Sequence, residues 1–138
     1  MPARVHAILV VRPEGRTPAA NHLQRTLAAL AAQTRPVDAL TIVLCGADPA
    51  LTQVAASSGA EGVITAPAGT PFAVATALAT PRLTGDAVWL LAQDTAPDPD
   101  ALVRLAGALE LSSSLAVAAP KLVAPEASAS LNALCCAQ

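Results

Sequence analysis

Aromatic side chains are almost missing from this sequence, which has one Trp, one Phe and no Tyr in 138 residues. Proteins that bind single-stranded nucleic acid stack its bases on aromatic side chains, so the composition argues against that class. Positive charge is scarce too, because eight Lys and Arg residues stand against ten Asp and Glu residues. Without a basic patch, neither nucleic acid nor an anionic membrane surface is indicated as a partner.

Long apolar runs and cysteine motifs are also lacking. No uninterrupted apolar run approaches the roughly 20 residues of a membrane-spanning helix, and residues 7–11 are too short for the core of a signal peptide. Cys45, Cys135 and Cys136 show no C-x-x-C spacing, so they fit neither a zinc site nor a disulfide framework. We therefore expect reduced thiols and a cytoplasmic location, at the inner membrane face if the chain is part of a longer protein.

Motifs of several enzyme classes are absent as well. The sequence has no G-x-S-x-G, P-loop or G-x-G-x-x-G. It therefore lacks the signature motifs of hydrolases, NTPases and dinucleotide dehydrogenases. His6 and His22 have no acidic or cysteine partner at metal-binding spacing, so we expect both to be structural or exposed.

What the sequence does contain is an alternation of apolar runs and amphipathic segments. It predicts strands at Val5–Val11, Ala39–Cys45 and residues 62–65, 87–91 and 115–119, and helices at residues 21–32, 49–57, 72–79 and 99–110. Such alternation predicts a Rossmann-like α/β domain, with a mostly parallel sheet and helices on both faces. A flavodoxin-like sheet, which differs in strand order, is the alternative. We expect the domain to span residues 1–123 and a poorly structured tail to span residues 124–138.

Residues 87–102 carry the strongest local signal. Their apolar run lies between Gly85 and the polar Gln93, which predicts a strand buried on both faces. Asp94 follows at the carboxyl end of this strand, where open α/β sheets bind ligands. Asp98 before Pro99 predicts a helix N-cap and a first helical residue. The segment is thus predicted to be a strand, an acidic turn and a helix.

This segment resembles the nucleotide-sugar segment of family-two glycosyltransferases with the GT-A fold. In that family a strand delivers an acidic D-x-D and a Pro-Asp-x-Leu helix start follows; here the last acid of D-x-D falls on Asp94 and the first on Ala92. LQRTLAALAAQTRPVDAL at residues 23–40 and VAAPKLV at residues 117–123 are also similar to the family, especially its actinobacterial members. The resemblance covers about residues 5–123 and implies the GT-A nucleotide-binding half.

The resemblance implies a role for Asp94 as a metal ligand. Its carboxylate would bind a divalent cation, Mg²⁺ or Mn²⁺, that bridges the diphosphate of a sugar nucleotide. The alternative is that Asp94 only caps a turn after the strand.

Residues after the first two strands are implied to contact the nucleotide. Val11, Arg12 and Pro13 lie where the family's loop packs on base and ribose. Arg12 could also meet a phosphate, although an ordinary solvated loop arginine is an equal alternative. Cys45 stands where the family usually has a nucleoside-binding Asp, and Asp48 follows three residues later. Asp48 is favoured as a helix cap over a ligand residue.

The function implied is binding of a nucleotide diphosphate sugar, for inverting transfer to a polysaccharide, such as a cell-wall polysaccharide, or to a lipid-linked acceptor. Family members continue with an acceptor-binding half that carries the catalytic base, and no residue of this chain is assigned that role. We therefore expect the chain to be inactive alone unless the C-terminal half or self-association completes it. The alternative is a non-catalytic binding or interaction module descended from such an enzyme, favoured by Ala92 and Cys45 in place of acids.

Overall fold

The computed structural model describes residues 2–13, 19–46 and 48–123, and the expected tail at residues 124–138 lies outside these. The described part contains one sheet of four parallel strands in the order β3-β2-β1-β4. The strands are β1 (Val5–Val11), β2 (Ala39–Cys45), β3 (Gly62–Ala66) and β4 (Ala87–Ala92). This confirms the Rossmann-like α/β fold. The flavodoxin-like alternative is wrong, because it would place β1 between β2 and β3.

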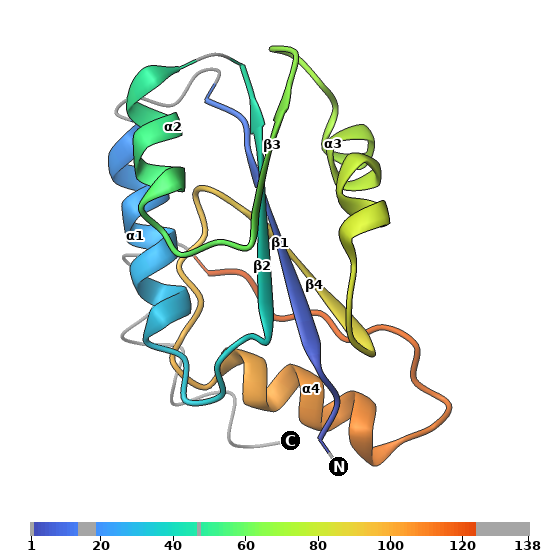
Figure 1. Ribbon diagram of the computed structural model, residues 1–138. Coiled ribbons are helices and arrows are strands. Elements are labelled where there is room, and N and C mark those ends of the chain that lie inside the picture. The colour runs from blue at the N-terminus through green and yellow to red at the C-terminus, as the bar shows by residue number, and fades with distance from the viewer. Residues whose placement is uncertain (1, 14–18, 47, 124–138) are drawn as a thin grey trace.

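Helices cover both faces of the sheet, as predicted (Figure 1). On one face lie α1 (Ala19–Ala31) and α2 (Pro49–Ala56), and on the other lies α3 (Phe72–Ala79), which runs into a short 3₁₀ turn. The chain steps in one direction from β1 to β3 and returns across the sheet to β4, so right-handed crossovers place α3 opposite α1 and α2. None of the helices described is long and apolar enough to cross a membrane.

β1 lies at the centre of this arrangement and is buried along its whole length. Leu9 and its alternate neighbours pack under α1 and α2, whereas Ile8 and Val10 pack under α3. A strand covered on both faces favours apolar residues, and β1, VHAILVV, has them at every position except His6, whose buried ring is hydrogen bonded.

β4 departs from the prediction that it is buried on both faces. Leu91 is 7% exposed, but Val88 and Leu90 are 45% and 49% exposed. The physical reason is its position at the edge of the sheet, while α3 packs on β1, β2 and β3. The face of β4 that shares its side with α3 therefore remains open.

The helix after β4 also begins later than predicted. α4 (Ala101–Leu111) has Asp100 at its N-cap position, without a side-chain cap, so the prediction that Asp98 caps it and Pro99 starts it is wrong. The carbonyl of Asp98 instead accepts a hydrogen bond from Gln33 Nε2 at 2.7 Å. Gln33 Oε1 accepts the Leu102 N–H at 3.0 Å, so a side chain of the segment after α1 satisfies the start of α4.

The strand predicted at residues 115–119 is wrong as well. These residues are described, but they form no strand. Leu115 N–H donates to the Ser112 carbonyl in a turn, and Val117 is 79% exposed. An apolar run becomes a strand only when a neighbour pairs with its backbone, and none of the described strands does so here.

Arg35 and Glu110 tie α4 to the segment after α1 and to the N-terminal segment. Arg35 Nη2 lies 2.8 Å from Glu110 Oε1, and the Ala3 N–H donates to the same oxygen at 2.8 Å. The hydrogen bonds from Arg35 and then Ala3 lower the pKa of Glu110. A carboxyl with a lowered pKa in the folded state stabilises the fold above its unfolded pKa, and this contribution disappears as pH falls through the folded pKa.

We therefore expect Glu110→Gln to lower the urea midpoint near neutral pH, and the difference from the native chain to close in acid, below the lowered pKa of Glu110. Urea titrations across this pH range measure the difference. Glu61→Gln is the control, because Glu61 is exposed and its side chain makes no ion pair among the described residues. A Glu110→Gln deficit that stays constant in acid would contradict the expectation.

Candidate functional site

The four strands end at one edge of the sheet, so residues far apart in sequence meet there. Arg12 follows β1, Asp48 follows β2 and Asp94 follows β4. β1 lies between β2 and β4, and its last residues pair with Leu44 on one side and Ala92 on the other. The carboxyl edge therefore brings together the segments that the sequence predicted as ligand contacts, with Arg12 in the middle.

Gln93 joins the ends of β1 and β4, and no sequence motif assigns it a role. Its side chain is buried, Oε1 accepts the Arg12 N–H at 3.1 Å, and Nε2 donates to the Arg12 carbonyl at 2.5 Å. One carboxamide thus satisfies both backbone groups of Arg12. The sequence signal for this role is a polar residue directly after an apolar strand. The signal does not identify the partner, because Arg12 lies 81 residues away in sequence.

Thr26 of α1 holds the turn after β4 from the other side. Its hydroxyl oxygen lies 2.7 Å from the Gln93 carbonyl and 2.6 Å from the Thr95 carbonyl, and both can accept its hydrogen. The Thr26 side chain and its contact with the Gln93 carbonyl are buried, whereas the contact with the Thr95 carbonyl is partly buried. The carbonyls of the two residues that flank Asp94 therefore both lie against α1, where either can accept the one hydrogen of the Thr26 hydroxyl.

Asp94 itself is exposed and lies in the turn that begins at Ala92. The Thr95 N–H and hydroxyl both donate to the Ala92 carbonyl, at 3.2 and 2.7 Å, which closes the turn. Asp94 is thus a central residue of a β-turn held at both ends. Its carboxylate is at the surface of the carboxyl edge, where the sequence predicted it.

Val11 and Cys45 were predicted near the nucleotide, but their side chains face the core. Val11 is 0% exposed under α1 and α2, and Cys45 is 1% exposed in the cluster under α3. Only their main-chain groups are therefore placed to meet a ligand. Arg12 and Pro13 are half-buried at the end of β1.

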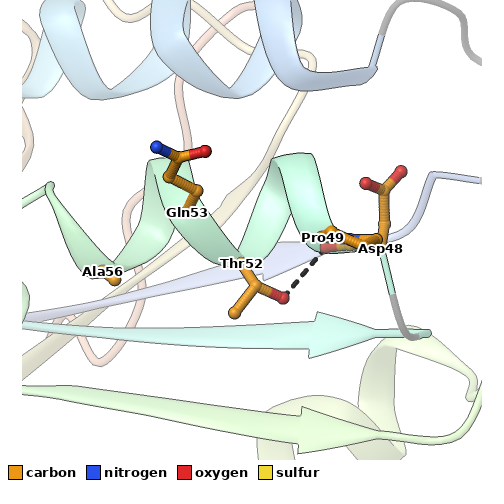
Figure 2. A pocket seen from close by; sticks show the side chains of 5 residues that line it. All are labelled: Asp48, Pro49, Thr52, Gln53 and Ala56. Carbon is orange, nitrogen blue, oxygen red and sulfur yellow. Dashed lines mark hydrogen bonds between the residues drawn. The ribbon is translucent and has the colours of Figure 1, made fainter.

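Asp48 is the N-cap of α2, the role the sequence favoured. Its carboxylate accepts the N–H groups of Ala50 and Leu51, at 2.8 and 3.3 Å, with Pro49 at the first helical turn. A hollow of about 410 Å³ beside it is lined also by Thr52, Gln53 and Ala56. Figure 2 shows these side chains along α2. All of the hollow's lining comes from α2 and its cap, and its one carboxylate already serves the helix, so we assign this hollow no ligand.

His6 has the structural role expected of it. It is buried in β1, where the Thr84 N–H donates to Nδ1 at 3.1 Å and Nε2 lies 2.8 Å from Thr41 Oγ1. Because Nδ1 accepts a hydrogen bond, Nε2 carries the hydrogen and donates it to Thr41. The imidazole therefore links β1 to β2 and to the loop before β4.

The described residues contain no group of three or more His, Cys, Asp and Glu side chains that could hold a metal ion. Asp48 and Asp94 follow strands separated by β1, roughly 10 Å at the usual strand spacing. A cation at Asp94 would therefore draw its other ligands from water or from a bound anion, rather than from Asp48.

Comparison with known proteins assigns no family to this geometry. No protein-family model matches the chain, and no curated protein sequence matches it. The residues at the carboxyl edge of the sheet are therefore the features that point to a function.

Proposed function

We propose that the chain binds a nucleotide diphosphate sugar at the carboxyl edge of its sheet, as the nucleotide-sugar half of a family-two glycosyltransferase with the GT-A fold. The observation that carries the proposal is the position of Asp94, exposed in a turn directly after β4 and next to β1, the strand that Arg12 follows. Open α/β sheets bind ligands at this edge. The ordered motifs that resemble the family supply the class of ligand.

Two charged side chains at this edge suit a diphosphate. The Asp94 carboxylate would hold Mg²⁺ or Mn²⁺, which neutralises the phosphates and completes its coordination with their oxygens and with water. The Arg12 guanidinium, on the neighbouring strand end, would pair with a phosphate oxygen. The main chain from Val11 to Pro13 would pack against the nucleoside.

Binding, without sugar transfer, is the activity proposed for these residues. Inverting transfer requires a carboxylate that takes the proton of the acceptor hydroxyl. Among the described acids after Asp94, Asp98 and Asp100 contact the segment that follows α1, and Glu110 pairs with Arg35. α1 runs antiparallel to the strands, so these acids lie toward the opposite edge of the sheet and are not placed to act as the base.

Isothermal titration calorimetry with UDP, GDP and dTDP sugars, with and without Mn²⁺, tests the proposal. We expect heat from one of these nucleotide classes, and tighter binding with Mn²⁺. Asp94→Asn keeps the shape of the side chain but removes its charge, so it should weaken Mn²⁺-dependent binding about tenfold or more, the equivalent of one charge-assisted contact.

Asp98→Asn is the matched control, because Asp98 is also an exposed acid, four residues further along the chain. Its binding should equal that of the native chain. The proposal is rejected if no sugar nucleotide produces heat, or if Asp94→Asn binds as tightly as Asp98→Asn in the presence of Mn²⁺.

A non-catalytic binding or interaction module is the second candidate, and the burial of Cys45 favours it. The family usually places a nucleoside-binding acid at this position, whereas the Cys45 side chain packs with Val10 and Ala66 in the core. Ala92 replaces the first acid of D-x-D. A chain of this kind keeps the fold without the ligand, so a folded protein with no heat from any sugar nucleotide supports this candidate.

A further inference from the structure

We propose that Gln93 is a positioning residue, whose carboxamide fixes the end of β1 at Arg12 relative to the turn that carries Asp94 and thereby determines affinity for the diphosphate. This inference rests on the proposed function, because it concerns the same edge of the sheet. It adds a residue that contacts no ligand and acts through the backbone of Arg12.

The geometry of the carboxamide carries the inference. The β1–β4 ladder has its last residue pair at Val10 and Ala92, and the Gln93 N–H still donates to the Val10 carbonyl at 3.3 Å. Beyond this point the Gln93 side chain links the two strand ends, through the N–H and carbonyl of Arg12. Burial of a carboxamide is unfavourable unless it is hydrogen bonded, so these two contacts hold the side chain in a single position.

The link between Gln93 and Arg12 also fixes the position of Asp94. Asp94 is the next residue after Gln93, and the carbonyls of Gln93 and Thr95 on either side of it lie 2.7 and 2.6 Å from the Thr26 hydroxyl oxygen, whose one hydrogen either can accept. The main chain at Asp94 therefore cannot move away from Arg12 without breaking a buried hydrogen bond to α1 or to β1. A diphosphate that contacts both Arg12 and Asp94 requires their spacing to be fixed before it binds.

Gln93→Glu breaks the link with almost no change of shape. A carboxylate accepts the Arg12 N–H but has no hydrogen for the Arg12 carbonyl, so two oxygens face each other and the strand ends separate. We expect the Arg12 amide hydrogen to exchange about tenfold faster or more in the ligand-free protein. We also expect the sugar nucleotide to bind about tenfold more weakly. Both sizes correspond to the free-energy cost of leaving one buried acceptor, the Arg12 carbonyl, without a hydrogen bond. Gln93→Met, of similar length and without hydrogen bonds, replaces this variant if it does not fold.

Gln33→Glu is the matched control. Gln33 is also buried and also makes a double contact, with Nε2 donating to the Asp98 carbonyl and Oε1 accepting the Leu102 N–H. Its substitution should reduce stability to a similar degree, but the hydrogen bonds that are lost lie at the amino edge of the sheet, away from Arg12 and Asp94. Exchange at Arg12 and affinity for the sugar nucleotide should therefore remain at native values, which separates positioning from a general loss of stability.

The two measurements distinguish the possible failures. Unchanged exchange at Arg12 in Gln93→Glu overturns the inference, whatever the affinity. Native affinity in Gln93→Glu, with faster exchange at Arg12, also overturns it, because the link would then be structural only. No heat from any sugar nucleotide with the native chain overturns the proposed function and the positioning role together, while the exchange data still report on the link itself.

Discussion

Gly85→Ala is expected to destabilise the fold by about 3 kcal/mol or more, the sum of an unfavourable backbone conformation and a collision. Gly85 has a φ of +96°, and a Cβ there would lie 2.7 Å from the Arg4 carbonyl oxygen. That oxygen accepts hydrogen bonds from the N–H groups of Asp86 and Ala87, at 2.8 and 3.1 Å, where β4 begins to pair with β1. Relief of the collision would therefore weaken the start of β4.

Gly59→Ala separates the two contributions. Gly59 has a φ of +76°, but a Cβ there meets nothing within 4 Å, so only the backbone conformation is unfavourable. We expect a loss of about 1 to 2 kcal/mol for this variant. Urea denaturation followed by circular dichroism measures both losses, and equal values would show that the contact with Arg4 has no role.

The central strands could be predicted from sequence because both of their faces are covered. In β1 and β2 every position is buried or nearly so, and each appears in the sequence as a run that is apolar apart from one residue, His6 or Thr41, and is followed by an arginine or a glycine. The predicted limits of both strands, Val5–Val11 and Ala39–Cys45, are those of the structure. Here the local pattern and the tertiary environment demand the same residues.

β4 has the same pattern and a different environment. Its run AVWLLA resembles a central strand, yet Val88 and Leu90 are half exposed. Whether a strand is central or at the edge depends on what pairs with it and on which face the next segment packs. After β4 the chain returns along α1, through the contacts of Thr26 and Gln33, and leaves the other face open. No local pattern contains this information.

The start of α4 shows the same limit at a helix end. Asp98-Pro99 and Asp48-Pro49 have the same sequence pattern, but only Asp48 caps its helix. At the other pair, Gln33 reaches the Leu102 N–H from another element and makes a local cap unnecessary. A side chain from a distant segment therefore overrides the local preference.

The sequence predicts where the residues of the candidate site lie, but not the contacts between them. Asp94 and Arg12 could be assigned to strand ends, because the carboxyl ends of parallel strands share one edge. The link between them could not be predicted, because Gln93 and Arg12 are brought together by the pairing of β1 with β4, and the two residues are 81 positions apart in sequence. Burial of the Cys45 side chain likewise depends on which face of β2 meets α3.

Leu9→Ala is expected to cost about 2 to 5 kcal/mol, a large part of the roughly 5 to 15 kcal/mol that stabilises a typical domain. Leu9 is 0% exposed and lies between Ile42 on β2 and Leu91 on β4, beneath α1 and α2. Hydrogen-bonded ladders hold β1 on both sides, so the backbone cannot move to fill the space. The cavity therefore persists, which places the cost toward the upper part of the range. Urea denaturation of the purified variant measures it.

Leu90→Ala removes the same atoms from the same sheet and provides the control. Leu90 pairs with Ile8, one position along β1 from Leu9, but it is 49% exposed on the open face of β4. Its substitution loses only part of the transfer free energy and leaves no enclosed cavity, so we expect less than about 1 kcal/mol. Both substitutions remove the same atoms, so the difference between their losses of unfolding free energy measures the effect of burial. A Leu90→Ala loss as large as that of Leu9→Ala would mean that another surface covers this face of β4 in solution.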